Sequence, residues 1–251
     1  MNQTTTALAL RPRFAGVDLL VVALALAAGL AAMRVIGTLG PANLRAMLPL
    51  GFVLMATLPW SLLAPEGRKQ IGLRRAGVLP CLTGVACGVA AASICFALGW
   101  LLFGTSADNW YVSIAAAYRK VMNTAGFDLL KLHLIFTIPA CLFSPLGEEI
   151  FFRGFLQRAL ESRFSSRQST HAEAALFGIV HLCHHGLFVS AAGLQVRWAS
   201  GALWVVLMFG TAWMFAWLRQ RSNSLWPAVA SHVAFNLTMN VAIFAALWQF
   251  Q

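Results

Sequence analysis

Two adjacent glutamates, Glu148 and Glu149, lie in the apolar segment SPLGEEIFFRGF of a chain that has only eight acidic residues. His181, His232 and Asn236 follow in later apolar segments. An ionisable residue inside a membrane helix costs about 2.5–3.5 kcal/mol on insertion scales and therefore suggests a function. A carboxylate can take a proton from water, an imidazole can hold that water, and an imidazole with an amide can stabilise an oxyanion. Together these residue types are typical of amide hydrolysis by activated water.

The expected helices bring three of these groups to a similar depth. At a rise of 1.5 Å per residue, Glu148, His181 and His232 lie roughly 6–15 Å inside the cytoplasmic boundary, which polar residues scattered at random would not do. Glu149 and Arg153 are four residues apart, so one helical face can hold them as an ion pair. Glu148 is rotated from Glu149 by about 100° and can point elsewhere.

The segments that must position these groups are hydrophobic. The chain has 251 residues, of which 59% are hydrophobic and 10% charged, whereas soluble domains average about 45–50% and roughly 25%. A spanning helix needs about 20 apolar residues, and no alternating pattern suggests a barrel. We predict an all-α, polytopic transmembrane helical bundle of about seven spans, with eight as the alternative, forming one domain over residues 1–251. The long apolar runs are 17–36, 48–64, 78–103, 132–152, 203–218 and 225–250, and a further span is expected to start near Ala172.

The net charge of +10 does not indicate nucleic-acid binding, because the basic residues are scattered between apolar runs. Cytoplasmic loops collect Lys and Arg, so we expect the larger basic set inside, with a cytoplasmic N-terminus and an active site in the cytoplasmic half of the membrane. The expected inner set is Arg11, Arg13, Arg68, Lys69, Arg74, Arg75, Arg153, Arg158, Arg163, Arg167, Arg219 and Arg221. The expected outer set is Arg34, Arg45, Arg119, Lys120, Lys131 and Arg197.

Other features of the sequence indicate structure more than catalysis. Residues 104–131 mix apolar and charged side chains at helical spacing, which predicts an amphipathic helix at the outer interface. Pro145 and Gly147 are expected to loosen the helix before the glutamates. His184 and His185 are not favoured as direct participants. Several polar residues near span ends need only solvation, namely His133, His171, Asp18 and Glu173. The cysteines match no disulfide or zinc spacing and are expected to be buried thiols: Cys81, Cys87, Cys95, Cys141 and Cys183.

Each polar group also has a structural explanation. An ion pair such as Glu149–Arg153 is by itself more often structural, and His232 with Asn236 could join helices. The combination at matched depth favours an enzyme, and the lack of a recognisable Ser or Cys nucleophile motif favours water as the nucleophile. The alternative is a non-enzymatic transporter, or a bacteriocin-immunity or scaffold protein on the same fold. Broken helices in inverted repeats would favour a transporter, and the sequence shows none.

Three motifs in order resemble one known family. Glu148-Glu149-Ile-Phe-Phe-Arg153 is similar to the EExxxR motif of the CPBP intramembrane proteases, which include type II CAAX prenyl endopeptidases and bacteriocin-processing relatives. FGIVH, residues 177–181, is similar to the FxxxH motif of that family, and HVAFN, residues 232–236, to its HxxxN motif. The resemblance covers approximately residues 132–240, the expected catalytic core.

The resemblance implies an intramembrane endopeptidase with a conical cavity open to the cytoplasm. It implies Glu148 as the base that activates water with His181 as its partner, His232 and Asn236 as the oxyanion-stabilising pair, and supporting roles for Glu149 and Arg153. Metal dependence stays open: two histidines and a glutamate could bind Zn²⁺ with an open position, through Glu148, His181 and His232. The implied substrate is a peptide with a membrane anchor, such as a prenylated tail, a leader or a sorting segment. The Ala-, Arg- and Trp-rich composition favours a bacterial inner membrane.

Overall fold

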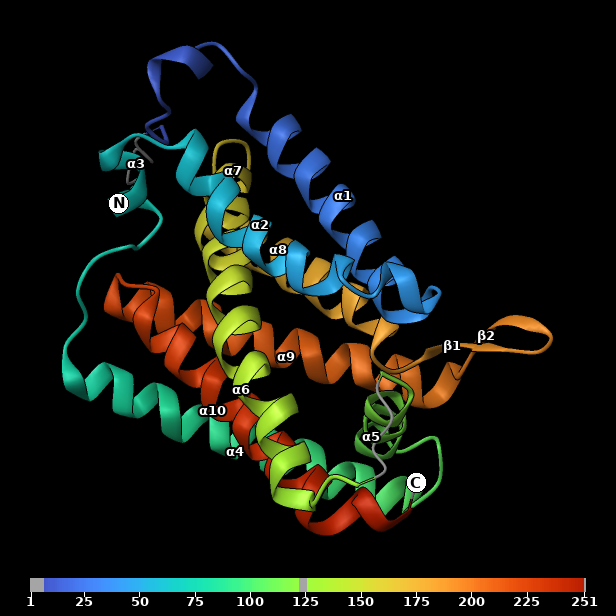
Figure 1. The fold of residues 1–251 in the computed structure, drawn as a ribbon. Helices are drawn as coiled ribbons and strands as arrows, with labels where there is room; N and C mark the ends of the chain where they lie inside the picture. Colours follow the sequence, from blue (N-terminus) through green and yellow to red (C-terminus); the bar gives the residue numbers. More distant parts are fainter. Residues whose placement is uncertain (1–6, 122–125, 251) are drawn as a thin grey trace.

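Residues 7–121 and 126–250 are described by the computed structural model, in which long helices make up most of the chain (Figure 1). Six of them are long and apolar enough to cross a membrane. These spans are Leu19–Leu39 (α1), Ala42–Leu62 (containing α2, Met47–Leu62), Val78–Phe103 (α4), Leu129–Leu160 (containing α6, Leu129–Glu148, and α7, Gln157–Leu160), Trp198–Ser222 (α9) and Trp226–Leu247 (containing α10, Trp226–Ala242). The predicted all-α membrane fold is confirmed.

The number of candidate spans is six among the described residues, compared with the seven expected from the sequence. The difference is the span expected near Ala172. That segment forms α8 (Ser166–Val180), which has 15 residues and begins with a capping box between Ser165 and Gln168. A helix of this length is shorter than the roughly 20 residues that a span needs. It nevertheless packs between the spans and delivers His181 at its C-terminal end.

The segment expected to be amphipathic forms α5 (Trp110–Val121), although residues 122–125 lie outside the described part of the chain. Its apolar face is buried in the protein. Trp110 donates from Nε1 to the carbonyl oxygen of Cys95 at 3.1 Å, and the Tyr111 hydroxyl donates to the carbonyl oxygen of Ala92 at 2.9 Å. The apolar face of this helix therefore packs on α4, whereas the sequence predicted that it would lie at the outer membrane interface.

The loop after α8 forms a small sheet that the sequence analysis did not predict. Strands β1 (Leu187–Ser190) and β2 (Gly193–Val196) pair antiparallel, with Leu187 opposite Val196. The hairpin projects from one side of the helical body (Figure 1). A short helix, α3 (Pro65–Gln70), occupies the basic loop after α2.

Two close helix contacts fix the positions of the site-bearing helices. A Cβ at Gly88 of α4 would clash with the carbonyl oxygen of Ser231, so α10 lies directly against α4 one residue before His232. A Cβ at Gly147 of α6 would clash with the backbone of Phe52, so α2 lies directly against the turn that carries the glutamates. Only glycine permits so close an approach of two backbones.

Candidate active site

The two glutamates lie where the fourth candidate span changes its helical geometry. The α-helix α6 contains Pro139 and Pro145 and ends at Glu148, and the chain continues as a π-helical segment, Glu149–Leu156. Proline has no N–H to donate to the carbonyl four residues earlier, and π-helical turns within α-helices are frequent at functional sites. Both glutamate side chains are fully buried. The loosening predicted for this stretch is thus present as a π-helical segment just after Pro145 and Gly147.

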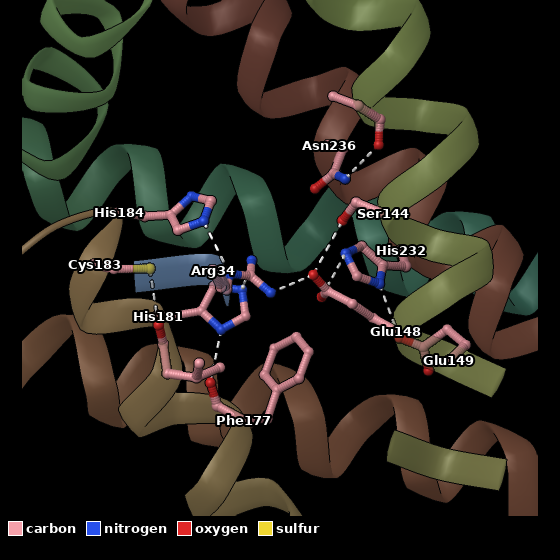
Figure 2. Close-up of polar contacts among 12 residues, drawn as sticks. Arg34, Ser144, Glu148, Glu149, Phe177, His181, Cys183, His184, His232 and Asn236 are labelled. Atoms are coloured by element: carbon pink, nitrogen blue, oxygen red, sulfur yellow. Dashed lines mark hydrogen bonds and ion pairs between the residues drawn. The ribbon is translucent and has the colours of Figure 1, made fainter. Parts of the chain in front are cut away.

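One oxygen of Glu148 is held and the other is free. Oε1 accepts from the guanidinium of Arg34 on α1, and Ser144 Oγ lies 3.4 Å from the same oxygen. Oε2 has no hydrogen-bond partner among the described residues, and it lies 3.9 Å from Nε2 of His232. Figure 2 shows these groups facing one another from α1, α6 and α10. A small polar molecule such as water could contact both free atoms.

Arg34 also contacts two histidines in the loop that follows α8. Its NH2 nitrogen lies 3.1 Å from Nε2 of His181, and its Nε donates to Nε2 of His184 at 3.1 Å (Figure 2). The other ring nitrogen of His181, Nδ1, lies 2.6 Å from the carbonyl oxygen of Phe177. His181 therefore donates through Nδ1 and accepts through Nε2.

The electrostatics of these two histidines agree with that assignment. Both lie between α8 and β1, outside the six candidate spans. Burial, followed by the charge of Arg34, lowers the pKa of His181 and of His184 well below the ordinary value. Each imidazole is then neutral and has a lone pair on Nε2 to accept an Arg34 N–H.

The second glutamate orients His232. Nδ1 of His232 lies 2.8 Å from Oε1 of Glu149, and NH1 of Arg153 lies 3.2 Å from the same oxygen. The predicted Glu149–Arg153 ion pair is confirmed. The Arg153 guanidinium also lies 4.0 Å above the centre of the Phe177 ring, an arrangement that attracts the cation to the ring face.

Glu173 belongs to the same buried group, contrary to the expectation that it would be solvated near a span end. Its Oε1 lies 3.5 Å from Nε of Arg153, and both side chains are fully buried. The reason is that α8 packs against the π-helical segment of the neighbouring span, so the face of α8 that carries Glu173 is covered by protein. His185, which the sequence analysis did not favour, lies apart from the site between Ser113 and Ser200.

Asn236 lies one helical turn beyond His232 on α10. Its Nδ2 donates to the carbonyl oxygen of Ala140 on α6 at 2.9 Å, and its side chain is 8% exposed. One amide N–H is used by this contact, and an amide has a second. Asn236 therefore lies beside the glutamate-bearing helix with one donor available.

A cavity of about 410 Å³ opens onto these groups. Its charged, imidazole, amide and hydroxyl lining residues include Arg34, Ser144, His181, His184, Thr211, His232 and Asn236. The remaining lining is almost wholly apolar and comes from α2, α5, α6, α9 and α10. It includes Phe52, Tyr118, Phe136, Phe143, Met208, Phe215 and Met239. A cavity with a few convergent polar groups on apolar walls is the usual form of a binding site for a small or lipid-like group.

The structure thus brings the predicted residues His181, His232 and Asn236 to the wall of one cavity, and Glu148 lies fully buried behind that wall, next to Arg34 and His232. Their order of contact is specific: Arg34 lies between Glu148 and His181, while His232 is the imidazole that faces the free oxygen of Glu148. The sequence analysis missed Arg34, which it assigned to the outer end of the first span. The signal that could have found it is that Arg34 is the only charged residue in α1.

A metal ion held by Glu148, His181 and His232 does not fit this arrangement. Among the described residues, no group of three or more His, Cys, Asp or Glu side chains is arranged to hold a metal. The Nε2 lone pair of His181 is directed at Arg34, and the guanidinium introduces a positive charge next to the carboxylate. A ligand nitrogen must have its lone pair free for the metal.

The comparison with known protein families matches the segment that holds all three sequence motifs of this site. Residues 130–238 match the model described as type II CAAX prenyl endopeptidase Rce1-like. No curated protein and no solved structure matches the chain. The matched residues contain Glu148, Glu149, His181, His232 and Asn236, whereas Arg34 lies outside them. With its six apolar helices, the chain is an integral membrane protein, and its residues 130–238 are similar to the type II CAAX prenyl endopeptidases, which supports membership of the CPBP family of intramembrane proteases.

Proposed function

We propose that this protein is an intramembrane endopeptidase that uses Glu148 to activate water. The observation that supports this most directly is the free Oε2 of Glu148, buried and 3.9 Å from Nε2 of His232 at the polar end of the cavity. A water molecule between these atoms has an acceptor for its proton and a second group to fix its direction. Geometry of this kind is what general base catalysis requires.

The proposed reaction uses the side chains as follows. Glu148 takes a proton from water while the oxygen attacks the carbonyl carbon of the scissile peptide bond. Asn236 donates its second amide N–H to the oxyanion that develops, and His232 donates to it from Nε2 when both of its ring nitrogens carry a proton. These interactions gain strength in a site from which bulk water is excluded. The proton held by Glu148 passes to the leaving amine, the C–N bond breaks, and a new carboxylate and a new amine are released.

His232 depends on Glu149 for this role. Because its Nδ1 is bound to Glu149, its Nε2 is the nitrogen that faces the cavity. The ion pair with Arg153 in turn holds the Glu149 carboxylate in position. This is the common arrangement in which a buried carboxylate sets the orientation of a working imidazole.

The cavity supports a substrate with an apolar, membrane-anchored group. Most of its wall is aromatic and aliphatic, and its volume of about 410 Å³ is within the usual range for ligand cavities. A prenylated or otherwise lipid-bearing peptide, or a hydrophobic sorting segment, fits this description. We place the protein in a bacterial inner membrane, with its active site in the cytoplasmic half.

Comparison of membrane proteins from cells that express the wild type, Glu148→Gln or Glu66→Gln tests the proposal. Glu66 is an exposed residue of α3 paired with Lys69, so its substitution is the matched control. N- and C-terminal proteomics should reveal at least one precursor that accumulates uncleaved only with Glu148→Gln. Identical terminal peptides in all three strains, with equal amounts of inserted protein, would contradict the proposal.

A further inference from the structure

The polar end of the cavity contains a fixed positive charge that comes from a helix outside the family-matched segment. Arg34 is on α1, whereas the match covers residues 130–238. Its side chain is 3% exposed. A buried arginine in a span is costly and is retained where it has partners.

All three of its nitrogen atoms have partners in the site. NH1 donates to Glu148, NH2 lies at His181 and Nε donates to His184. A guanidinium is planar and always charged, and it can hold several acceptors in a fixed arrangement, which a lysine ammonium cannot reproduce. The Glu148 carboxylate and the imidazoles of His181 and His184 therefore surround the guanidinium of Arg34, in the way that ligands surround a metal cation.

A second, exposed contact lies at the other end of α1. Arg163, just after α7, lies 2.9 Å from Asp18, the N-cap of α1. Asp18 precedes Arg34 by nearly the same number of residues as Glu148 precedes Arg163. The two segments therefore run side by side with an ion pair at each end. The Arg163–Asp18 pair is exposed and contributes little, whereas the Arg34–Glu148 pair is buried.

We propose that Arg34 is a positioning residue that supplies the resident cation of this active site: it holds Glu148 in place and occupies the lone pairs of His181 and His184, so that no metal ion binds there. The role assigned to Glu148 rests on the proposed function, whereas the exclusion of metal rests on the Arg34 contacts alone. Removing the guanidinium leaves a carboxylate and two imidazoles around one vacated position. Three such ligands with an open fourth position are the usual protein set for zinc.

Zinc binding tests this without any substrate. Purified wild type, His181→Ala, Arg34→Ala, Arg34→Ala/His181→Ala and Arg163→Gln are stripped with a chelator and titrated with Zn²⁺ against a competing dye. Arg163 is the matched control because it pairs with Asp18 at the exposed end of α1. We expect that neither the wild type nor Arg163→Gln binds Zn²⁺ in a way that depends on His181. Arg34→Ala should bind one equivalent of Zn²⁺, and the double variant Arg34→Ala/His181→Ala should not.

Two results would overturn the proposal. One is a wild type that binds one equivalent of Zn²⁺ which His181→Ala abolishes. The other is a folded Arg34→Ala protein that gains no zinc. If Arg34→Ala does not fold, the wild-type titration still decides whether a metal ion binds at this site, and Arg34→Lys, which retains a cation, still tests the positioning role in the kinetic comparison.

The kinetic comparison tests the positioning role with the peptide identified by proteomics. Arg34→Gln should lower kcat about 100-fold with little change in KM, because a displaced Glu148 affects the reaction more than binding. Arg34→Lys should recover part of that loss, and Arg163→Gln should behave as the wild type. A rise in KM at unchanged kcat in Arg34→Gln would contradict the positioning role and would leave the proposed function of Glu148 intact.

Discussion

Nδ1 of His232 is bound to Oε1 of Glu149 at 2.8 Å, so the second glutamate of the pair holds the imidazole that faces the first. Adjacent residues on the helix thereby have different tasks. Glu148 directs one free oxygen toward His232, while Glu149 connects that histidine to Arg153. The change from α-helical to π-helical geometry between them sets the two carboxylates on different neighbours.

Substitution of Glu149 should affect catalysis through His232. Glu149→Gln retains an oxygen that can accept from Nδ1, whereas Glu149→Leu has none. We expect kcat to fall about 10–100-fold in Glu149→Gln, the range seen when the partner of a functional histidine is changed, and further in Glu149→Leu. Steady-state kinetics of both variants beside the exposed control Glu66→Gln checks this order. Equal activity in Glu149→Leu and wild type would refute the orienting role.

Asn236 should contribute to the transition state more than to substrate binding. Removing one oxyanion donor lowers kcat by about 10²–10³ in well-studied hydrolases, and we expect Asn236→Ala to fall in that range with KM nearly unchanged. Its contact with Ala140 makes a stability control necessary, so thermal unfolding is measured on the same preparation. A variant that loses only stability would show that Asn236 joins the helices and does no more.

The buried cluster around Arg153 predicts opposite outcomes for its members. Arg153→Gln leaves Glu149 and Glu173 as two buried carboxylates without a cation, so we expect a loss of about 3–5 kcal/mol in the free energy of unfolding. Glu173→Gln leaves the Glu149–Arg153 pair in place and should change stability much less. Unfolding of both variants in mixed detergent gives the comparison. A larger loss for Glu173→Gln than for Arg153→Gln would contradict this account.

His185 should make stability depend on pH. Burial, with a further effect of Arg197, lowers the pKa of His185 to about 4 against the opposing influence of Asp108. Because the folded-state pKa is below the ordinary value, its contribution is complete above about pH 6.5 and is lost as the pH falls toward 4, by up to about 3 kcal/mol. Melting temperatures from pH 7.5 to 4.5 should fall less in His185→Gln than in the wild type. The exposed His171→Gln is the control, and parallel curves for all three proteins would exclude this role.

The sequence contains enough information to predict the helices and most of the site. Long apolar runs predicted all six spans, because hydrophobic length determines whether a helix can cross a membrane. The spacing of Glu149 and Arg153 predicted their ion pair, since residues four apart share a helical face. The polar residues of three segments were correctly expected to come together.

Contacts between helices far apart in the chain could not be predicted. Arg34 and Glu148 are separated by 114 residues, and nothing in the spacing of either segment indicates that α1 lies beside α6. Glu173 was expected to be solvated because it lies near the predicted end of a span, yet packing of α8 covers it. The spacing of residues within one helix shows which side chains share a face. It does not show which other helix packs against that face.

The most direct test of the central claim is hydrolysis by reconstituted protein in ¹⁸O-labelled water. The probe is a synthetic peptide that spans the cleavage site found by proteomics, in proteoliposomes that contain equal amounts of wild type, Glu148→Gln or Glu66→Gln. We expect one ¹⁸O atom in the new C-terminal carboxylate with the wild type and with Glu66→Gln, and no product above background with Glu148→Gln. Cleavage by Glu148→Gln at the wild-type rate would contradict the account.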